Sequence, residues 1–112
     1  MESRMIYESD KTYLSKIHWK KPKNNIESEW SYLNAEKLTE NELEEIFVEN
    51  FAGEYLYLVT SRNESVQINT TEVFSKIKAL YGKTEFRIWS EDFESVVEFK
   101  LEVYRKGEKA SR

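Results

Sequence analysis

The sequence predicts an α+β fold, with an antiparallel or mixed sheet of four to six strands and two amphipathic helices packed on one face. Two segments, starting near Thr39 and near Asn69, combine a helix start signal, an apolar stripe of helical period and a closing glycine. Runs of β-branched and aromatic residues follow both segments and are joined in pairs by short polar turns. Strands paired through short turns favour hairpins over parallel crossovers.

A single domain accounts for the length of the chain. The 112 residues are 39% hydrophobic and 34% charged, with three glycines and one proline. A chain of this size buries roughly two thirds of its unfolded surface, which is enough for one core. We expect residues 1–105 to form one globular domain and residues 106–112 to form a polar, frayed C-terminal tail.

The N-terminal third has the weakest pattern. Within residues 6–19, Tyr13, Ile17 and Trp19 alternate with polar positions well enough for a strand, although a short helix capped by Ser9 or Asp10 is an alternative. Residues 20–25 include a proline and two asparagines, which predict a break. Residues 29–33 are expected to return as a second short strand.

The first helix is predicted from its start signal. Thr39 can cap the helix and Glu42 can reach back to the Thr39 amide, so the helix is expected to begin at Glu40. Gly53 stands where a left-handed C-terminal cap is expected. One buried stripe of helical spacing is formed by Leu43, Ile46, Phe47 and Phe51.

A hairpin is predicted after the first helix. Residues 54–60 are apolar on both faces and rich in strand formers, which is typical of a central strand covered on both sides. Residues 61–64 form a polar turn, and residues 65–68 form a short partner strand. We therefore expect these two strands to pair antiparallel.

The second helix has the same kind of start signal as the first. Asn69 is the expected cap, Glu72 is the residue that reaches back to it, and Gly82 is expected to end the helix. The inward stripe of this helix is formed by Val73, Phe74, Ile77, Leu80 and Tyr81.

Two more strands are predicted after the second helix. Residues 84–90 form the first, Glu91 and Asp92 form the turn, and residues 96–104 form the second. The last strand alternates strictly and is expected to have one solvent-exposed face. Its inward positions are Val97, Phe99, Leu101 and Val103.

The residue types exclude the common catalytic and cofactor chemistries. There is no cysteine, and the single histidine, His18, has no zinc partner at helical spacing and no serine in a nucleophile context. No glycine-rich loop is present to hold phosphate. Carboxylates are plentiful, but a chain this short leaves little wall for a deep cleft. We expect no enzyme activity, no catalytic residue, no metal and no cofactor.

The N-terminus and the cysteine content bear on location. Residues 1–10 contain no apolar stretch of the kind that a signal peptide or a membrane span requires. A chain without cysteine suits a reducing compartment. We expect a cytoplasmic protein with no membrane partner.

Negative charge is concentrated in the first helix. No lysine or arginine lies between Lys37 and Arg62, and like charges four residues apart in a helix destabilise it by a few tenths of a kcal/mol, roughly 0.2–0.5 per pair. An acidic face that binds a basic partner is the functional interpretation, and a solvated face is the alternative. The acidic residues of this helix are Glu40, Glu42, Glu44, Glu45 and Glu49.

A second acidic segment lies at the turn after residues 84–90. Its aromatic side chains beside carboxylates are typical of an interface anchor with an electrostatic rim. The alternative is that Trp89 and Phe93 close the core at one end of the sheet. With the acidic helix, this segment completes the predicted partner-binding set: Glu42, Glu44, Glu45, Glu49, Trp89, Glu91, Asp92 and Glu94.

Positive charge is concentrated between Lys16 and Lys23, where lysines flank His18 and Trp19. Such a segment can contact nucleic-acid phosphates, and a solvated loop is the alternative. The formal net charge of −4 argues against a dedicated nucleic-acid binder. We expect no direct nucleic-acid partner.

Two segments of the chain have a distinctive order and charge. The first, residues 39–57, is an acidic helix that continues into an aromatic strand, and the second, residues 89–94, is an acidic and aromatic turn. In size, charge and element order the chain resembles the small immunity proteins that bacteria make against their own contact-dependent or secreted polymorphic toxins. The resemblance implies a stoichiometric inhibitor whose acidic surface covers the basic active site of a cognate protein toxin, such as a nuclease. The basic residues 16–23 leave open a toxin that is not a nuclease.

Three other functions are compatible with the same residues. A small enzyme would have a deep pocket in which the pKa values of carboxylates are strongly shifted. An acidic DNA mimic would present carboxylates at phosphate-like spacing to DNA-binding proteins. A homo-oligomeric structural module would use residues 96–104 as an edge strand. As an immunity protein, the free chain is expected to be a monomer or a weak dimer.

Overall fold

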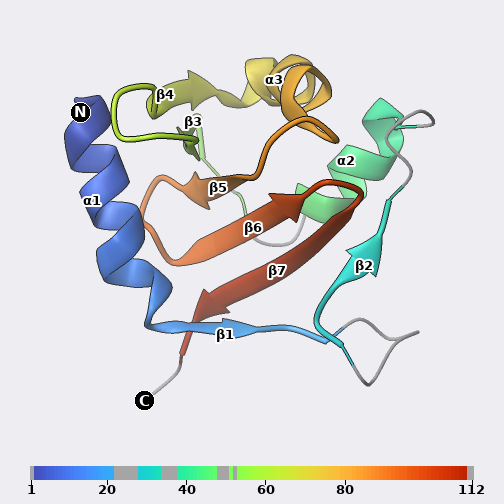
Figure 1. Cartoon of the computed structure of the whole chain (residues 1–112), viewed down its shortest axis with the longest axis horizontal. Coiled ribbons are helices and arrows are strands. Elements are labelled where there is room, and N and C mark those ends of the chain that lie inside the picture. Colours follow the sequence, from blue (N-terminus) through green and yellow to red (C-terminus); the bar gives the residue numbers. More distant parts are fainter. Residues whose placement is uncertain (1, 22–27, 34–37, 48–50, 52, 111–112) are drawn as a thin grey trace.

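In a computed structural model that describes residues 2–21, 28–33, 38–47, 51 and 53–110, the chain forms a seven-stranded antiparallel sheet and three α-helices (Figure 1). In chain order the elements are α1 (Ser3–Leu14), β1 (Ile17–Trp19), β2 (Ser31–Tyr32), α2 (Glu40–Phe47), β3 (Tyr55–Val59), β4 (Val66–Asn69), the 3-10 turn η2 (Thr70–Glu72), α3 (Val73–Leu80), β5 (Phe86–Ser90), β6 (Ser95–Lys100) and β7 (Val103–Lys109). The strand order is β1-β7-β6-β5-β3-β4, and β2 pairs with the start of β7.

The predicted α+β class and antiparallel pairing are confirmed, whereas the predicted element counts are too low. The described residues hold seven strands and three helices, so the prediction of two helices on one face is not confirmed. α2 and α3 contribute to one buried cluster, and α1 contributes to a second cluster on the other side of the sheet. Helices therefore cover both faces (Figure 1).

Side-chain alternation along the central strands separates the two clusters. In β5, Ile88 is buried in the cluster to which α2 and α3 contribute, while Trp89 is buried in the cluster to which α1 contributes. Successive residues of a strand point to opposite faces, so a strand in this position is buried on both sides. β3 lies beside β5 and is buried in the same way, which confirms the two-sided strand predicted for residues 54–60.

The strand predicted from Tyr13, Ile17 and Trp19 is only partly present. Ser3–Leu14 form helix α1, and only Ile17–Trp19 form a strand. The helical alternative is correct in type, but α1 begins before Ser9 and holds Asp10 in its interior. The cause is tertiary, because Asp10 is fully buried against β5, whereas local periodicity treats a carboxylate as a surface position.

Both predicted helix start signals are present. At α2, the Thr39 amide donates to the Glu42 carboxylate and the Glu42 amide donates to the Thr39 hydroxyl, each at 3.2 Å. At η2, which leads into α3, the Asn69 amide donates to the Glu72 carboxylate at 3.3 Å. These bonds satisfy amides that the helix itself leaves free. The predicted start of α2 at Glu40 is confirmed.

Of the two glycines predicted to end helices, Gly82 has the expected conformation and Gly53 does not. Gly82 follows α3 with a φ of 85°, in the left-handed region that favours glycine. Gly53 has no positive φ, so its predicted role as a left-handed cap is wrong. α2 is described as far as Phe47, and residues 48–50 lie outside the described residues.

Residues 96–104 form a hairpin instead of the single strand predicted for them. β6 ends at Lys100, β7 begins at Val103, and the two strands pair antiparallel. Leu101 lies in the turn with 61% of its surface exposed, so its predicted inward position is wrong. The error arises because strict alternation continues through the turn and hides it.

The predicted polar tail, residues 106–112, is strand for much of its length. β7 extends to Lys109, and β1 pairs along it with Trp19 opposite Gly107. A Cβ at Gly107 would lie 2.4 Å from the Ile17 side chain, so glycine permits the close approach of β1. The domain therefore extends beyond residue 105. Within this C-terminal segment, residues 111–112 lie outside the described residues.

Replacing Leu101 by glycine is expected to stabilise the protein. Leu101 has a φ of 46°, and the left-handed conformation costs an L residue about 1–2 kcal/mol. Glycine relieves this strain but has more freedom in the unfolded chain, so the expected net gain is about 0.5–1 kcal/mol. Urea unfolding of L101G against wild type measures the gain. L101A, which retains a Cβ, is the control without relief, and a less stable L101G would contradict the argument.

Candidate functional site

The carboxylates of α2 face the outside of the molecule. The apolar stripe of the helix is buried against the sheet, which turns the remaining positions toward solvent. Glu49 lies outside the described residues. The acidic side chains that the structure places on the exposed part of α2 are Glu40, Glu42, Glu44 and Glu45.

The ion pairs found among the described residues involve none of these four carboxylates. Lys106 of β7 lines the same hollow as Glu42 and Glu45, without pairing with either. Burial raises the pKa of the nearby Tyr104, and the negative charge of Glu45 acts in the same direction. Glu42 and Glu45 therefore share their surroundings with a lysine, whereas Glu40 and Glu44 face a different space.

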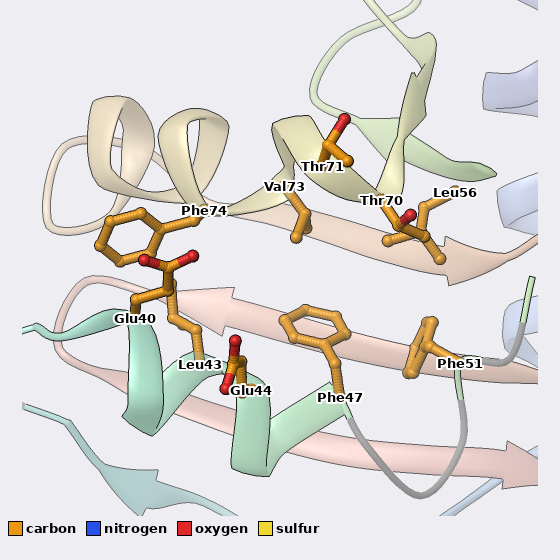
Figure 2. A pocket seen from close by; sticks show the side chains of 10 residues that line it. All are labelled: Glu40, Leu43, Glu44, Phe47, Phe51, Leu56, Thr70, Thr71, Val73 and Phe74. Carbon is orange, nitrogen blue, oxygen red and sulfur yellow. The ribbon is translucent and has the colours of Figure 1, made fainter. Parts of the chain in front are cut away.

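That space is an apolar groove of about 440 Å³ between α2 and α3 (Figure 2). α2 forms one wall, and η2 with the first turn of α3 forms the other. Figure 2 shows the side chains of Phe47 and Val73 pointing into the gap from opposite walls. The apolar lining consists of Leu43, Phe47, Phe51, Leu56, Val73 and Phe74.

The groove has carboxylates and hydroxyls among its lining as well. Glu40 and Glu44 stand one helical turn apart on α2, on the same face of the helix. Thr70 and Thr71 line the opposite wall. An apolar interior beside exposed carboxylates favours an apolar group that carries positive charge.

Trp89 is not the exposed anchor predicted from the sequence. Its side chain is completely buried, and its Nε1 donates to Asp10 Oδ1 at 2.7 Å. Phe93 is also buried and stacks on Tyr57 and Tyr13, with ring centroids 4.8 and 5.3 Å apart. The alternative, in which Trp89 and Phe93 close the core, is correct. Trp89 is therefore removed from the candidate site.

The carboxylates of the β5–β6 turn are exposed, but two of them have local contacts. Asp92 accepts from the Ser90 hydroxyl at 2.6 Å and from the Glu94 amide at 3.0 Å. The Glu91 carboxyl group lies beside Gly53, where an added Cβ would be 3.0 Å from its Cδ. Figure 1 shows this turn and α2 at opposite ends of the β5–β6 hairpin. The two acidic segments therefore do not form one compact patch.

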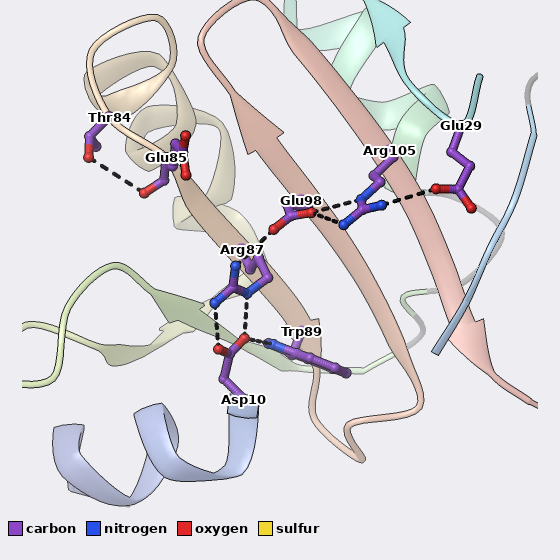
Figure 3. Close-up of polar contacts among 8 residues, drawn as sticks. All are labelled: Asp10, Glu29, Thr84, Glu85, Arg87, Trp89, Glu98 and Arg105. Carbon is purple, nitrogen blue, oxygen red and sulfur yellow. Dashed lines mark hydrogen bonds and ion pairs between the residues drawn. The ribbon is translucent and has the colours of Figure 1, made fainter. Parts of the chain in front are cut away.

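A ladder of alternating charges crosses the face of the sheet opposite to α2 and α3 (Figure 3). Arg87, Glu98 and Arg105 occupy paired positions on β5, β6 and β7. Glu98 forms ion pairs with Arg87 at 2.8 Å and with Arg105 at 2.7 Å. Asp10 pairs with Arg87 at one end at 2.6 Å, and Glu29 pairs with Arg105 at the other end at 3.0 Å.

Burial makes this ladder a structural feature. Asp10 is 0% exposed and Glu98 is 5% exposed, so each requires the partners that the ladder supplies. Burial lowers the pKa of Arg87, but the hydrogen bonds and charges of its two carboxylate partners outweigh burial and raise the pKa above its usual range. Arg105 also lies 3.7 Å above the Trp19 ring. These contacts hold α1 and β1 against the sheet.

The sequence contains a partial signal for the ladder. Arg87 and Glu98 occupy positions of apolar strands that face a core, and an opposite-charge pair across neighbouring strands fits such positions. Asp10 is 77 residues away from Arg87, so local periodicity cannot connect them. The groove was missed for the same reason, because its two walls come from separate helices.

Two buried tyrosines have raised pKa values and act as structural groups. Burial raises the pKa of Tyr57 to about 12, and the neighbouring Tyr55 contributes to this rise. Burial also raises the pKa of Tyr81, whose hydroxyl donates to the Leu33 carbonyl at 2.7 Å. This bond connects the chain after β2 to the end of α3.

The basic segment at residues 16–23 has contacts of its own. Lys20 forms an ion pair with Glu108 at 3.5 Å, and Lys16 lies over the Tyr13 ring. His18 is exposed on β1. These contacts attach the segment to β7 and α1. Of its other two lysines, Lys21 is exposed and Lys23 lies outside the described residues.

Within the described part of the chain, no group of three or more histidine, cysteine, aspartate or glutamate side chains is placed to hold a metal ion. No helix there combines the length and the apolar character that crossing a bilayer requires. Comparisons with family models, with curated proteins and with solved structures find no match. The candidate site is therefore defined by geometry: the groove between α2 and α3 and the exposed carboxylates of α2.

Proposed function

We propose that this chain is a protein-binding module that neutralises a cognate protein toxin, as small bacterial immunity proteins do, by covering a basic active site with the acidic face of α2. The proposal assigns no catalytic step to the chain. The observation that carries it is a pair of exposed carboxylates, Glu40 and Glu44, that line an apolar groove and form no ion pair among the described residues, with Glu45 exposed on the same helix.

Electrostatics supports a partner of positive charge. Glu40 and Glu44 repel each other at a spacing that costs an isolated helix about 0.2–0.5 kcal/mol. A cationic surface laid over them removes this repulsion. Charge of one sign on one face also speeds encounter with an oppositely charged partner. The repulsion within α2 and the rate of encounter therefore both favour binding to a positively charged surface.

The groove favours the interpretation that the acidic face binds a partner over the alternative that it is only a solvated surface. Protein interfaces combine an apolar centre with a polar rim, and most of the binding energy comes from a few buried anchors. α2 supplies both parts, because Leu43 and Phe47 line the groove while Glu44 stands between them in sequence and is exposed. The β5–β6 turn lies away from this surface, so the proposed interface centres on α2.

The test compares wild-type chain with E40Q/E44Q/E45Q as bait in extracts of the native host. Three exposed glutamates outside α2 provide a charge-matched control, E8Q/E64Q/E85Q. A partner retained by wild type and by the control is expected to associate on the order of tenfold more slowly with the α2 variant at low salt. Surface plasmon resonance with the purified partner measures the rates, and high salt should reduce the difference.

The second arm tests neutralisation. The purified partner is expected to stop growth when it is produced alone in a host cell and to be harmless when it is produced together with this chain. A partner that is harmless alone contradicts the immunity function. Equal slowing by both triple variants contradicts the role of the α2 face, and displacement of the chain by duplex DNA would assign it to the DNA mimics.

A further inference from the structure

We infer that the groove between α2 and α3 is an anchor pocket for a protein segment that inserts an apolar side chain and carries a lysine or arginine beside it. The inference rests on the proposed function, because it specifies which part of a partner the acidic helix receives. Its occupant is a segment of a different protein chain.

The size and lining of the groove fit a side chain. A volume of about 440 Å³ lies within the range of ligand sites, roughly 300–1,000 Å³. Phe47, Val73 and Phe74 supply apolar contact from both helices (Figure 2). Val73 and Phe74 are only partly buried, so surface remains on the α3 wall that an incoming apolar group can cover.

Charge complementarity selects the neighbours of that side chain. Glu40 and Glu44 line the groove on one side, so a carboxylate or phosphate entering there would be repelled, whereas an ammonium or guanidinium would be attracted. The alkyl stem of a lysine or arginine can also lie along apolar surface while its charge reaches a carboxylate. Lys78 lies over the Phe74 ring, 5.3 Å from its centre, and pairs with neither glutamate among the described contacts.

The same charges argue against a second copy of this chain as the occupant. A two-fold contact places the same surface of each copy against the other. Such a contact would bring Glu40 and Glu44 of both copies together around one apolar space, with like charges facing each other. A partner of opposite charge fits the groove without this repulsion.

The probe is a matched pair of peptides, acetyl-Lys-Leu-Trp-Leu-Lys-amide and acetyl-Glu-Leu-Trp-Leu-Glu-amide, titrated into the ¹⁵N-labelled full chain. The cationic peptide is expected to shift the backbone amide resonances of Leu43, Phe47 and Val73 and to bind at least about fivefold more tightly than the anionic peptide. E40Q/E44Q should remove most of this preference. Equal binding of the two peptides, or shifts confined to other surfaces, would overturn the inference.

Blocking the groove provides a separate readout. V73W places an indole where Figure 2 shows a side chain pointing into the gap, and it is expected to weaken the cationic peptide by about tenfold or more. S75W adds the same indole to an exposed position of α3 that does not line the groove, and it should bind as wild type does. If V73W does not fold, F74A removes part of the apolar wall and should also weaken binding.

The outcomes separate this inference from the proposed function. A toxin that requires the α2 carboxylates but binds V73W and wild type equally would contradict the anchor pocket and still support the proposed function. A partner that enters the groove but is not toxic would support the anchor pocket and contradict the proposed function. Sedimentation of the free chain completes the test, because a dimer that V73W abolishes would make a second copy the occupant and overturn the inference.

Discussion

Asp10→Ala is expected to destabilise the fold by about 3–5 kcal/mol, because it removes one partner from a buried network of charges. Asp10 is fully buried and accepts from Arg87 Nε at 2.7 Å, from Arg87 Nη2 at 2.6 Å and from Trp89 Nε1 at 2.7 Å. Alanine leaves these donors without their acceptor, although it is itself the best helix former. Urea unfolding followed by circular dichroism measures the loss.

The control for Asp10 is Glu8, two residues earlier in α1. Glu8 is exposed on the same helix, and E8A is expected to change stability by no more than about 0.5 kcal/mol. D10N retains one acceptor oxygen but loses the charge, so its loss should be intermediate. If D10A costs less than about 1 kcal/mol, the network does not hold α1 to the sheet.

Trp89→Ala is expected to cost about 3–5 kcal/mol, in the range of large aromatic truncations in a core. The indole is 0% exposed, and it packs against the Phe93 ring with the centroids 5.4 Å apart. Trp89→Phe retains a ring but loses the hydrogen bond to the Asp10 carboxylate, so its expected loss is smaller, about 1.5–3 kcal/mol. Thermal and urea unfolding of both variants test this order.

Tyr32 is the matched control for an aromatic residue at the surface. It is 66% exposed, and Y32A is expected to stay within about 0.5 kcal/mol of wild type. Folded W89F should bind a partner as wild type does, because no part of the Trp89 ring is exposed. Loss of partner binding in folded W89F, without loss at α2 variants, would restore the turn as an interface.

The candidate site could be predicted in one half only. The acidic face of α2 follows from the sequence, because a buried apolar stripe necessarily turns the other positions of a helix outward. The structure adds that Glu40 and Glu44 line a groove while Glu42 and Glu45 share a hollow with Lys106. That distinction depends on which neighbours pack beside each face, and no pattern within the helix contains it.

Sequence alone determined the features that are built from near neighbours. The starts of α2 and of η2, which leads into α3, were predicted because their capping bonds join residues only three positions apart, such as Thr39 with Glu42. The β3–β4 hairpin was predicted because strand formers flank a short polar turn. In these cases the chemistry that sets the structure lies within the segment itself.

Only the tertiary structure decided the identity of α1, the burial of Trp89 and the existence of the groove. The residues around Asp10 are typical of a surface position. Asp10 is nevertheless buried, because Arg87 and Trp89, which are 77 and 79 residues away along the chain, donate hydrogen bonds to its carboxylate. The environment of a polar or aromatic side chain depends on the partner that reaches it. Where that partner is far away along the chain, periodicity describes the segment but not its surroundings.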